Sequence, residues 1–341
     1  MFCSKCGTKV PDGSNFCPNC REPMVAFNAP KPEPAAKKEP AVKAPPVGGT
    51  IKRISAGREL RLLLRQGWLV LVGDLRNLIF SLLFPVVAAL VTVLVAGKDM
   101  FVTYEGTKST CFILVCAAIW GGLFNSIQTL VKERGNIKRD YVSGALRIEC
   151  YMTSRAILQL GLCFIQSIIL TLSIPAMDWV HGNPYPSEGL IFSATLLEYF
   201  LTLFLVMFGA DAMGLMISSV VKKAELASTL APYILIAQLL FSGMLFKMEG
   251  FASTFSAIML SRWGMEALGS TSDLNALPLK ITQAEDFNPM LADQLPREFE
   301  DAFDADPAHL ALVLALLLAF VIVPLVVGDV MLHRVKKDSR D

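Results

Sequence analysis

Apolar runs of about twenty residues recur along this chain, and most of them contain no Lys, Arg, Asp or Glu. One run, residues 189–221, is interrupted only by Glu198 and Asp211. A helix needs about twenty consecutive apolar residues to cross the hydrocarbon core of a membrane. The pattern therefore predicts an α-helical integral membrane protein with six transmembrane helices, over residues 77–97, 109–131, 156–177, 189–221, 226–246 and 310–328.

The distribution of Lys and Arg predicts which side of the membrane each end faces. With the N-terminus in the cytosol, the inner segments carry eighteen Lys and Arg residues and the outer segments carry six. Positive residues collect on the cytosolic side. The opening residues, MFCSKCGTKV, also lack the basic and apolar regions of a signal peptide. We therefore expect a multi-pass protein of the cytoplasmic membrane, with cytosolic N- and C-termini and an outer segment at 247–308.

Composition supports the same class of protein. Of the 341 residues, 53% are hydrophobic and 18% are charged, whereas about a quarter of the residues of a soluble domain are charged. A soluble core would need helices that are apolar on every side on this scale, which disfavours that alternative. The net charge of +1 averages segments of opposite sign and identifies no partner.

Residues 51–76, ahead of the first run, have the pattern of an amphipathic helix that lies in the membrane interface. Trp68 has the kind of ring that is common at headgroup depth. Leu62 and Leu69 interrupt the pattern, so a long, basic-flanked start to the first span is the alternative. Three arginines share one helical face and four leucines lie opposite: Arg58, Arg61 and Arg65, and Leu60, Leu64, Leu71 and Leu75.

Two Cys-x2-Cys pairs, separated by ten residues, lie at the start of the chain. Each pair places two thiolates on one side of a turn, and two such pairs close a tetrahedral zinc site. A redox Cys-x-x-Cys motif is the alternative, but two copies without a βαβ pattern disfavour it. Residues 1–24 are therefore predicted to form a zinc ribbon in which a structural Zn²⁺ is held by Cys3, Cys6, Cys17 and Cys20.

Residues 25–50 form a linker rich in proline, alanine and lysine. This composition buries too little apolar surface to fold, which predicts an extended tether. The ribbon itself carries a few basic residues offset by acidic ones, a thin basic patch. We therefore favour a protein partner over nucleic acid for the ribbon.

Charges are concentrated in one internal connector, TLVKERGNIKRDYVSG, at residues 129–144. It is too charged to lie in lipid and too short to be a domain. Its mixed charges suit a short helix that binds another protein, with Ile137, Tyr141 and Leu146 supplying burial. A solvated loop is the alternative.

The connector and its flanks, IWGGLFNSIQTLVKERGNIKRDYVSGALRIECYMTSR, resemble type-2 ABC exporter permeases, especially their ABCG-like branch. Asp140 stands where a Glu is usual. Three further stretches resemble the family in the same order: VGDLRNLIFSLLFPVVAAL, GADAMGLMISSVVKKAELASTLAPYILIAQLLFSGMLF and LSRWGMEAL. The resemblance covers residues 51–335 and implies a six-span permease domain over 77–335, followed by a cytosolic tail at 336–341. The matching positions in the connector are Glu133, Arg134, Arg139, Asp140, Gly144, Ala145, Tyr151 and Arg155.

The resemblance implies that the connector and the amphipathic helix dock on a nucleotide-binding subunit and transmit ATP-driven movement to the spans. The chain contains no Gly-x4-Gly-Lys-Ser/Thr phosphate loop. We therefore expect no ATPase activity from this chain, ATP acting only through a separate ABC ATPase subunit, and two copies of the chain in the complex. The coupling residues that the resemblance assigns are Glu133, Arg134, Lys138, Arg139, Asp140 and Tyr141.

Acidic residues inside a membrane are costly and usually face a cavity or a partner. Glu198 and Asp211 are therefore candidates for a role in the transport pathway. The alternative is that each is held by hydrogen bonds to neighbouring helices. The sequence thus predicts the permease subunit of an ATP-driven exporter whose substrate is unidentified. A membrane-anchored zinc-ribbon adaptor or sensor without transport activity is the alternative.

Overall fold

The structure is a computed structural model that describes residues 54–244, 250–278 and 299–337, together with positions 6, 8, 9, 16, 17, 19 and 20 near the N-terminus. The chain divides into two compact units, Met1–Thr50 and Ile51–Asp341. The predicted linker at 25–50, and Cys3 of the predicted zinc site, lie outside the described residues.

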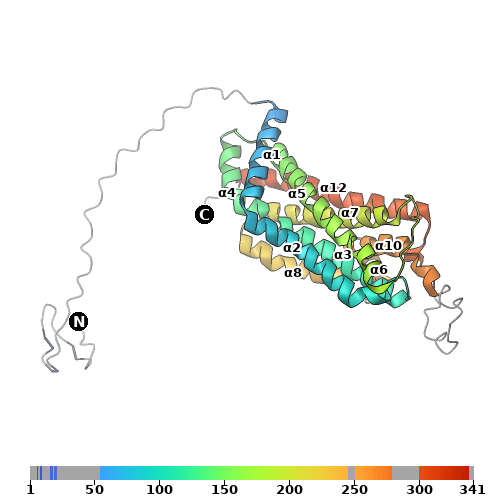
Figure 1. The fold of residues 1–341 in the computed structure, drawn as a ribbon. Coiled ribbons are helices and arrows are strands. Elements are labelled where there is room, and N and C mark those ends of the chain that lie inside the picture. The colour runs from blue at the N-terminus through green and yellow to red at the C-terminus, as the bar shows by residue number, and fades with distance from the viewer. Residues whose placement is uncertain are drawn as a thin grey trace. The chain divides into compact units, whose positions relative to one another are not determined.

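The second unit is a bundle of helices (Figure 1). Short turns of other helical types follow several of them, including a π-helical turn at Thr92–Ala96 and 3₁₀ turns at Leu274–Ala276, Asp301–Phe303 and His333–Lys337. The α-helices are α1 (Ala56–Gly73), α2 (Leu75–Val91), α3 (Tyr104–Ser126), α4 (Thr129–Val142), α5 (Ile148–Thr171), α6 (Ser173–His181), α7 (Thr195–Val220), α8 (Ala224–Leu240), α9 (Phe251–Ser256), α10 (Leu260–Thr271) and α12 (Pro307–Leu332).

Within the described residues, five helical stretches are long and apolar enough to cross a membrane. They cover the predicted first, second, third, fourth and sixth spans. The predicted fifth span, residues 226–246, contains the apolar helix α8, which is shorter, with 17 residues. The mostly helical membrane fold is therefore confirmed, and the count of six spans stays a prediction. The five stretches are Leu75–Val95, Tyr104–Val142, Ile148–His181, Thr195–Val220 and Pro307–Val335.

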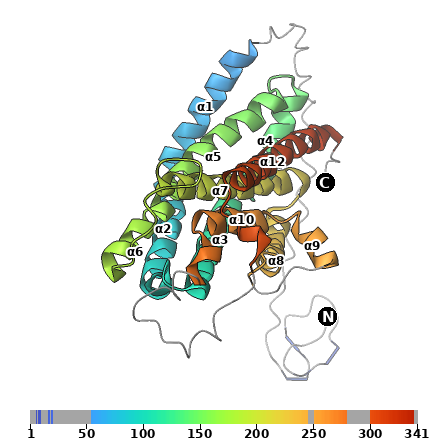
Figure 2. The same cartoon turned by 90° about the vertical axis from the view of Figure 1, so that its right-hand side faces the viewer.

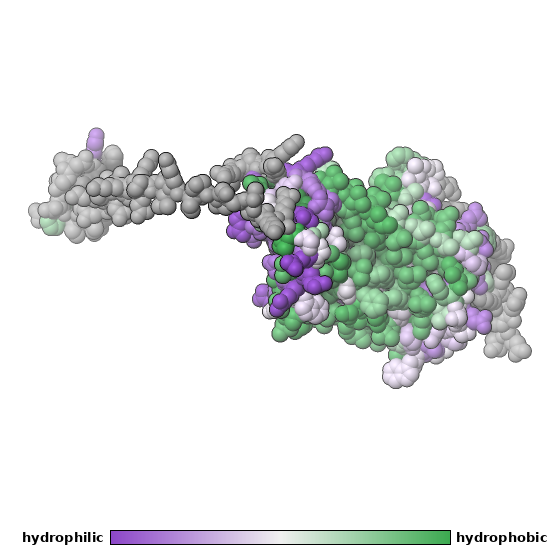
Figure 3. All heavy atoms as spheres, turned by 90° about the horizontal axis from the view of Figure 1, so that it is seen from above, coloured by the Kyte–Doolittle hydropathy of each residue, from purple (hydrophilic) through white to green (hydrophobic). Residues whose placement is uncertain are grey.

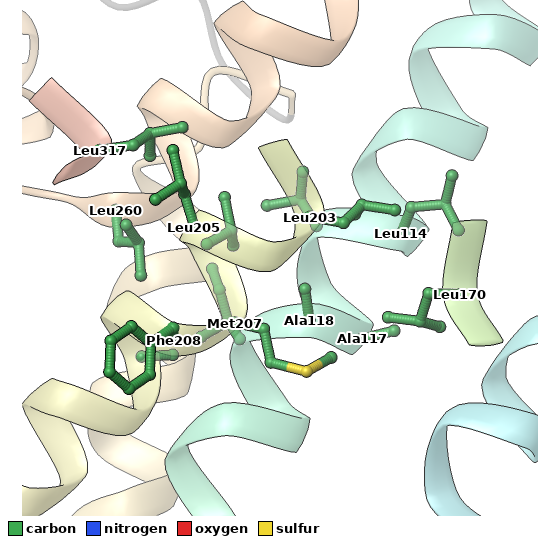
Figure 4. Packing of buried hydrophobic residues seen from close by; sticks show 14 of the residues in the cluster. Leu114, Ala117, Ala118, Leu170, Leu203, Leu205, Met207, Phe208, Leu260 and Leu317 are labelled. Carbon is green, nitrogen blue, oxygen red and sulfur yellow. The ribbon is translucent and has the colours of Figure 1, made fainter. Parts of the chain in front are cut away.

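Helix α7 lies at the centre of the bundle, among α3, α5, α10 and α12 (Figure 2). It is apolar on nearly every side and buries Leu203, Leu205 and Met207 against its neighbours (Figure 4). Small residues allow the closest approach: a Cβ atom at Gly122 of α3 would lie 2.0 Å from the Met207 carbonyl oxygen. Glycine at such a contact lets two helix backbones pack directly. The backbones of α3 and α7 are therefore in direct contact at this point.

The two ends of the bundle are polar, and the middle is apolar. Figure 3 shows a broad hydrophobic band between hydrophilic side chains at either end of the helices. At the end that holds α10, Lys108 of α3 lies 2.8 Å from Glu300 and over the rings of Tyr104 and Phe303. At the other end lie α4 and the start of α1 (Figure 1). This second end contains most of the residues that the sequence assigned to coupling.

Candidate functional site

Helix α4 is the charged connector, and it continues almost directly from α3. Its first turn leaves backbone amides without partners inside the helix, as every helix does. The amides of Leu130 and Val131 both donate to the Ser218 hydroxyl on α7, at 3.0 Å each. The connector is therefore a helix anchored at its start to the central span, which agrees with the predicted short helix and not with a solvated loop.

Glu133 joins α4 to α5. Its carboxylate lies 2.5 Å from the Arg155 guanidinium and accepts a hydrogen bond from the Tyr151 hydroxyl. Arg155 also donates from Nε to the Tyr151 oxygen at 3.3 Å, and its guanidinium lies 5.1 Å from the centre of the Tyr151 ring. The Arg155 side chain is 15% exposed and that of Glu133 is 35% exposed. Ion pairs of this kind hold geometry best when hydrogen bonds fix both partners, as they do here.

Arg134 joins α4 to α7. Its Nη1 atom donates to the backbone oxygens of Ser219 at 2.7 Å and Val221 at 3.3 Å. These oxygens lie at the C-terminal end of α7, where helix carbonyls have no partner within the helix and carry partial negative charge. Two adjacent residues of α4 thus contact two different transmembrane helices.

An apolar cluster lies beneath α4. Ile137 is 2% exposed and packs with Leu130, Tyr151 and Leu332. Tyr141 packs at its edge, with its ring 6.1 Å from that of His333. The predicted burial of Ile137, Tyr141 and Leu146 therefore matches the cluster.

The remaining coupling residues lie toward the outer surface of α4. The Arg139 side chain is 74% exposed and the Asp140 side chain 44% exposed, and they form an ion pair at 3.1 Å. Lys138 is half-buried. Exposed pairs of this kind contribute little to folding stability, so these side chains are available to a partner at small energetic cost.

Helix α1 packs against α5 beside this surface. Arg58, Arg61 and Arg65 are all exposed, as is Trp68. The contact with α5 is close: a Cβ atom at Gly67 would lie 2.3 Å from Leu158. The predicted amphipathic helix is thus present over Ala56–Gly73, with its basic residues facing away from the bundle.

The structure adds residues that sequence reasoning missed. Glu59 of α1 is 6% exposed, accepts a hydrogen bond from the Arg147 backbone amide at 2.7 Å and lies 3.6 Å from the Arg147 side chain. Ser218 anchors α4. The only sign of the Glu59 contact in the sequence is that Glu59 is the one acidic residue among the arginines at residues 58–65. Ser218, a serine within an apolar span, gives no such sign.

Glu198 and Asp211 lie in α7, apart from the α4 surface. Glu198 is in the first turn of the helix, and its Oε1 atom accepts hydrogen bonds from the backbone amides of Ile191 at 2.6 Å and Phe192 at 3.0 Å. Asp211 is fully buried, and neither of its carboxylate oxygens has a hydrogen-bond partner among the described residues. The two acids therefore have different surroundings.

The first unit contains a cluster of cysteines. The Sγ atoms of Cys6, Cys17 and Cys20 all lie within 4.8 Å of one another, and those of Cys6 and Cys17 are 3.6 Å apart. A tetrahedral zinc ion with sulfur ligands at about 2.3 Å has neighbouring sulfurs about 3.8 Å apart. The three described thiols therefore fit zinc. Hydrogen bonds with the Thr8 hydroxyl and backbone lower the pKa of the Cys6 thiol to about 6, because they stabilise its thiolate.

Comparison with known proteins identifies both units. Residues 2–20 match the zinc-ribbon domain family, and residues 58–271 match the ABC-2 type transporter family. The chain is also 24% identical over 260 residues to an ABC transporter ATP-binding/permease protein of Mycobacterium tuberculosis. That alignment covers 73% of this chain and 29% of the relative, so the chain spans less than a third of the relative's length. The chain belongs to the ABC-2 type transporter family and carries a zinc-ribbon domain near its N-terminus.

Proposed function

We propose that this chain is the transmembrane subunit of an ATP-driven type-2 ABC exporter, and that α4 with the start of α1 binds a separate ATPase subunit. One observation carries the proposal: adjacent residues of α4 contact two different spans. Glu133 pairs with Arg155 of α5, and Arg134 binds the carbonyl end of α7. A force on α4 therefore reaches both helices.

In this proposal the exposed side of α4 binds the partner, and the buried side attaches the helix to the bundle. Arg139 and Asp140 form the exposed surface that binds the partner, with Lys138 beside them. Arg58, Arg61 and Arg65 extend this surface along α1. Glu133, Arg134 and Tyr141 lie against the bundle and hold the helix in place. Because α7 packs directly on α3, a displacement of α4 moves the centre of the bundle.

The ATPase function lies on another polypeptide in this proposal. The relative from M. tuberculosis is named as both ATP-binding and permease, and this chain spans 29% of it. The 341 residues contain no phosphate-binding loop of the Walker type. The working complex is two copies of this chain with two ATPase subunits in a cytoplasmic membrane, both termini of the chain being cytosolic.

The zinc ribbon is a structural module in this proposal. Cys3, Cys6, Cys17 and Cys20 hold one Zn²⁺, and four protein ligands leave no open position for catalysis. The ribbon serves to recruit the ATPase or another protein partner.

Affinity purification tests the proposal. The tagged full-length chain, extracted from its native membrane with mild detergent, is expected to recover an ABC ATPase identified by mass spectrometry. The double substitution Arg139→Glu with Asp140→Lys is expected to reduce that recovery at least fivefold. Asp301→Lys is the matched control, because Asp301 is exposed at the opposite end of the bundle.

Two results would contradict the proposal. One is the absence of any ATPase in repeated purifications of the intact complex. The other is equal ATPase recovery from the α4 variant and the control. A complex that contains other proteins bound through the ribbon and no ATPase would support the adaptor alternative, and loss of those proteins in a Cys3→Ser, Cys6→Ser variant would identify the ribbon as their site.

A further inference from the structure

Asp211 places a carboxyl group inside the helical bundle. It lies in α7, nine residues before the helix ends at Val220, which corresponds to about 14 Å along the helix axis. Asp211 is fully buried, and so are Ala210 and Ala212 beside it. An ionised carboxylate loses its hydration when it is buried, so it is stable in such a place only if a partner replaces the water.

No hydrogen-bond donor reaches this carboxyl in the part of the chain that the structure describes, where neither of its oxygens has a partner. Ser126 of α3 lies next to the carboxyl, but its hydroxyl donates to the Asp211 backbone oxygen at 2.6 Å. Glu198, the other buried acid of α7, differs because it accepts hydrogen bonds from two backbone amides. Asp211 therefore lacks the donors that stabilise a carboxylate.

No charged side chain compensates for the missing donors. The helices α3, α4, α5, α8, α10 and α12 all pack against α7. Among the described residues of these helices, no Lys, Arg, His, Asp or Glu side chain faces the Asp211 carboxyl. The titratable group that does face it is the buried thiol of Cys163, on α5. An ion pair therefore does not hold Asp211 in place.

The position is also unsuited to a metal cation. Calcium and magnesium bind about six or more oxygen ligands. Within the described ranges, the one group of His, Cys, Asp or Glu side chains close enough together to hold a metal is the cysteine cluster of the zinc ribbon. The helices around Asp211 also pack closely, because a Cβ atom at Gly122 would lie 3.0 Å from the Asp211 backbone nitrogen. A Cβ atom at Gly214 would lie 2.3 Å from the Ser126 hydroxyl oxygen.

We propose that Asp211 is a proton-binding site, and that its carboxyl is held inside the bundle as the neutral acid at neutral pH. A proton is the cation that requires neither a set of ligands nor free volume, and its binding removes the charge that the surroundings do not offset. This site goes beyond the proposed function, since it is a property of the chain without an ATPase.

Infrared spectroscopy of the full-length chain tests the site. The chain is reconstituted in lipid nanodiscs at neutral pH, once unlabelled and once with isotopically labelled carbon in its aspartate carboxyl groups. A neutral carboxylic acid has a C=O stretching band that is separate from the bands of carboxylates, and the label shifts this band only if it arises from an aspartate. The band is expected in the wild-type chain, where Asp211 is the one aspartate that is buried among the described residues.

Substitutions assign the band to a residue. Asp211→Asn is expected to abolish it, because the amide has no acid proton. Asp301→Asn is the matched control and is expected to keep the band, since Asp301 is exposed. Asp211→Leu is a second variant with an apolar side chain, and size-exclusion profiles show whether each variant is folded. If neither Asp211 variant folds, the labelled wild-type spectrum still decides whether a neutral aspartic acid is present.

The pH dependence of stability is a second measurement. The folded chain keeps a proton on Asp211 that the unfolded chain loses above the ordinary titration range of aspartate, about pH 4. Unfolding is therefore favoured as the pH rises. The unfolding equilibrium constant is expected to rise more steeply in the wild-type chain than in Asp211→Asn, by up to about tenfold per pH unit. Asp301→Asn is expected to keep the wild-type slope, and unfolding in mixed detergent micelles measures all three chains.

A folded wild-type chain without a labelled acid band would overturn the proposal, because Asp211 would then be ionised and held by water or a metal ion. So would a band that persists in Asp211→Asn, or equal pH slopes for the wild-type chain and Asp211→Asn. Neither measurement requires an ATPase. Their failure therefore leaves the proposed transport function standing, and loss of ATPase binding leaves the proton site standing.

Discussion

Glu133 and Arg155 lie 2.5 Å apart and join the connector helix α4 to α5. They are separated by the end of α4 and the turn into α5, yet both are held by the Tyr151 hydroxyl. The pair is thus a fixed joint between the surface that we assign to ATPase binding and a membrane span. In the function that we propose, this pair transmits movement of α4 to α5.

A double-mutant cycle measures the coupling free energy between Glu133 and Arg155. Glu133→Gln and Arg155→Gln are each expected to lower stability by about 1–3 kcal/mol, because each removes a charged hydrogen-bond partner and leaves the other. The double variant is expected to cost little more than one single variant, since the shared contact is already lost. Thermal unfolding in detergent checks the prediction. Additive single effects would show that the two residues act independently.

Close packing of α3 on α7 predicts a large difference between two glycines. Gly122→Ala places a methyl group about 2 Å from a backbone oxygen and is expected to cost about 1–3 kcal/mol or to prevent assembly. Gly161→Ala is expected to be neutral or slightly stabilising, because the site is open and alanine favours helix. Fluorescence-detected size-exclusion and melting temperature compare the two. Equal behaviour would contradict the packing of α3 on α7.

Substitutions at Glu198 distinguish a residue of the transport pathway from one that holds the segment before α7 in place. Its Oε1 atom accepts two backbone hydrogen bonds, and a glutamine keeps one such acceptor oxygen. Glu198→Gln is therefore expected to keep most transport and stability, whereas Glu198→Leu leaves the amides of Ile191 and Phe192 without this acceptor and is expected to cost about 1–2 kcal/mol. The ATPase activity of the purified complex in native lipid and the melting temperature of each variant measure the two effects. A strong loss of activity in a stable Glu198→Gln protein would instead favour a direct pathway role.

The rate at which Cys6 of the zinc ribbon is alkylated is expected to depend on pH. The pKa of the Cys6 thiol is lowered from 9.0 to about 6 by hydrogen bonds with Thr8, so the thiolate is present above that pH and is lost as the pH falls through it. After zinc removal by a chelator, alkylation of Cys6 by iodoacetamide is expected to reach half its maximal rate near pH 6. Zinc is expected to protect the residue. Mass spectrometry of the Cys6 peptide follows both effects, and a midpoint near 9 in a zinc-free ribbon that circular dichroism shows to be folded would contradict the assigned hydrogen bonds.

The positions of most membrane-spanning helices along the chain could be predicted by counting apolar residues. The predicted first span at 77–97 and the described stretch Leu75–Val95 differ by two residues at each end. The predicted fourth span began at residue 189, but α7 begins at Thr195. Residues just before it form non-helical backbone whose amides are held by Glu198. A count of apolar residues does not separate extended backbone from helix, and here one buried acid makes the difference.

The candidate site was predictable only in part. Mixed charges and spacing indicated a short helix at the connector, and the family resemblance indicated Glu133 and Arg134. The contact of Ser218 with α4 joins residues almost ninety positions apart, and that of Glu59 with Arg147 joins residues equally distant. Neither contact is encoded in local periodicity, because each depends on how the spans pack.

The order of synthesis gives the central position of α7 a further consequence. This helix buries two acids, and its partner α3 is made before it, while α12 is the last helix of the bundle. Until translation has passed Leu332, the end of α12, one side of α7 lacks the helix that covers it. Biogenesis therefore contains an interval in which the side of α7 that later contacts α12 faces lipid.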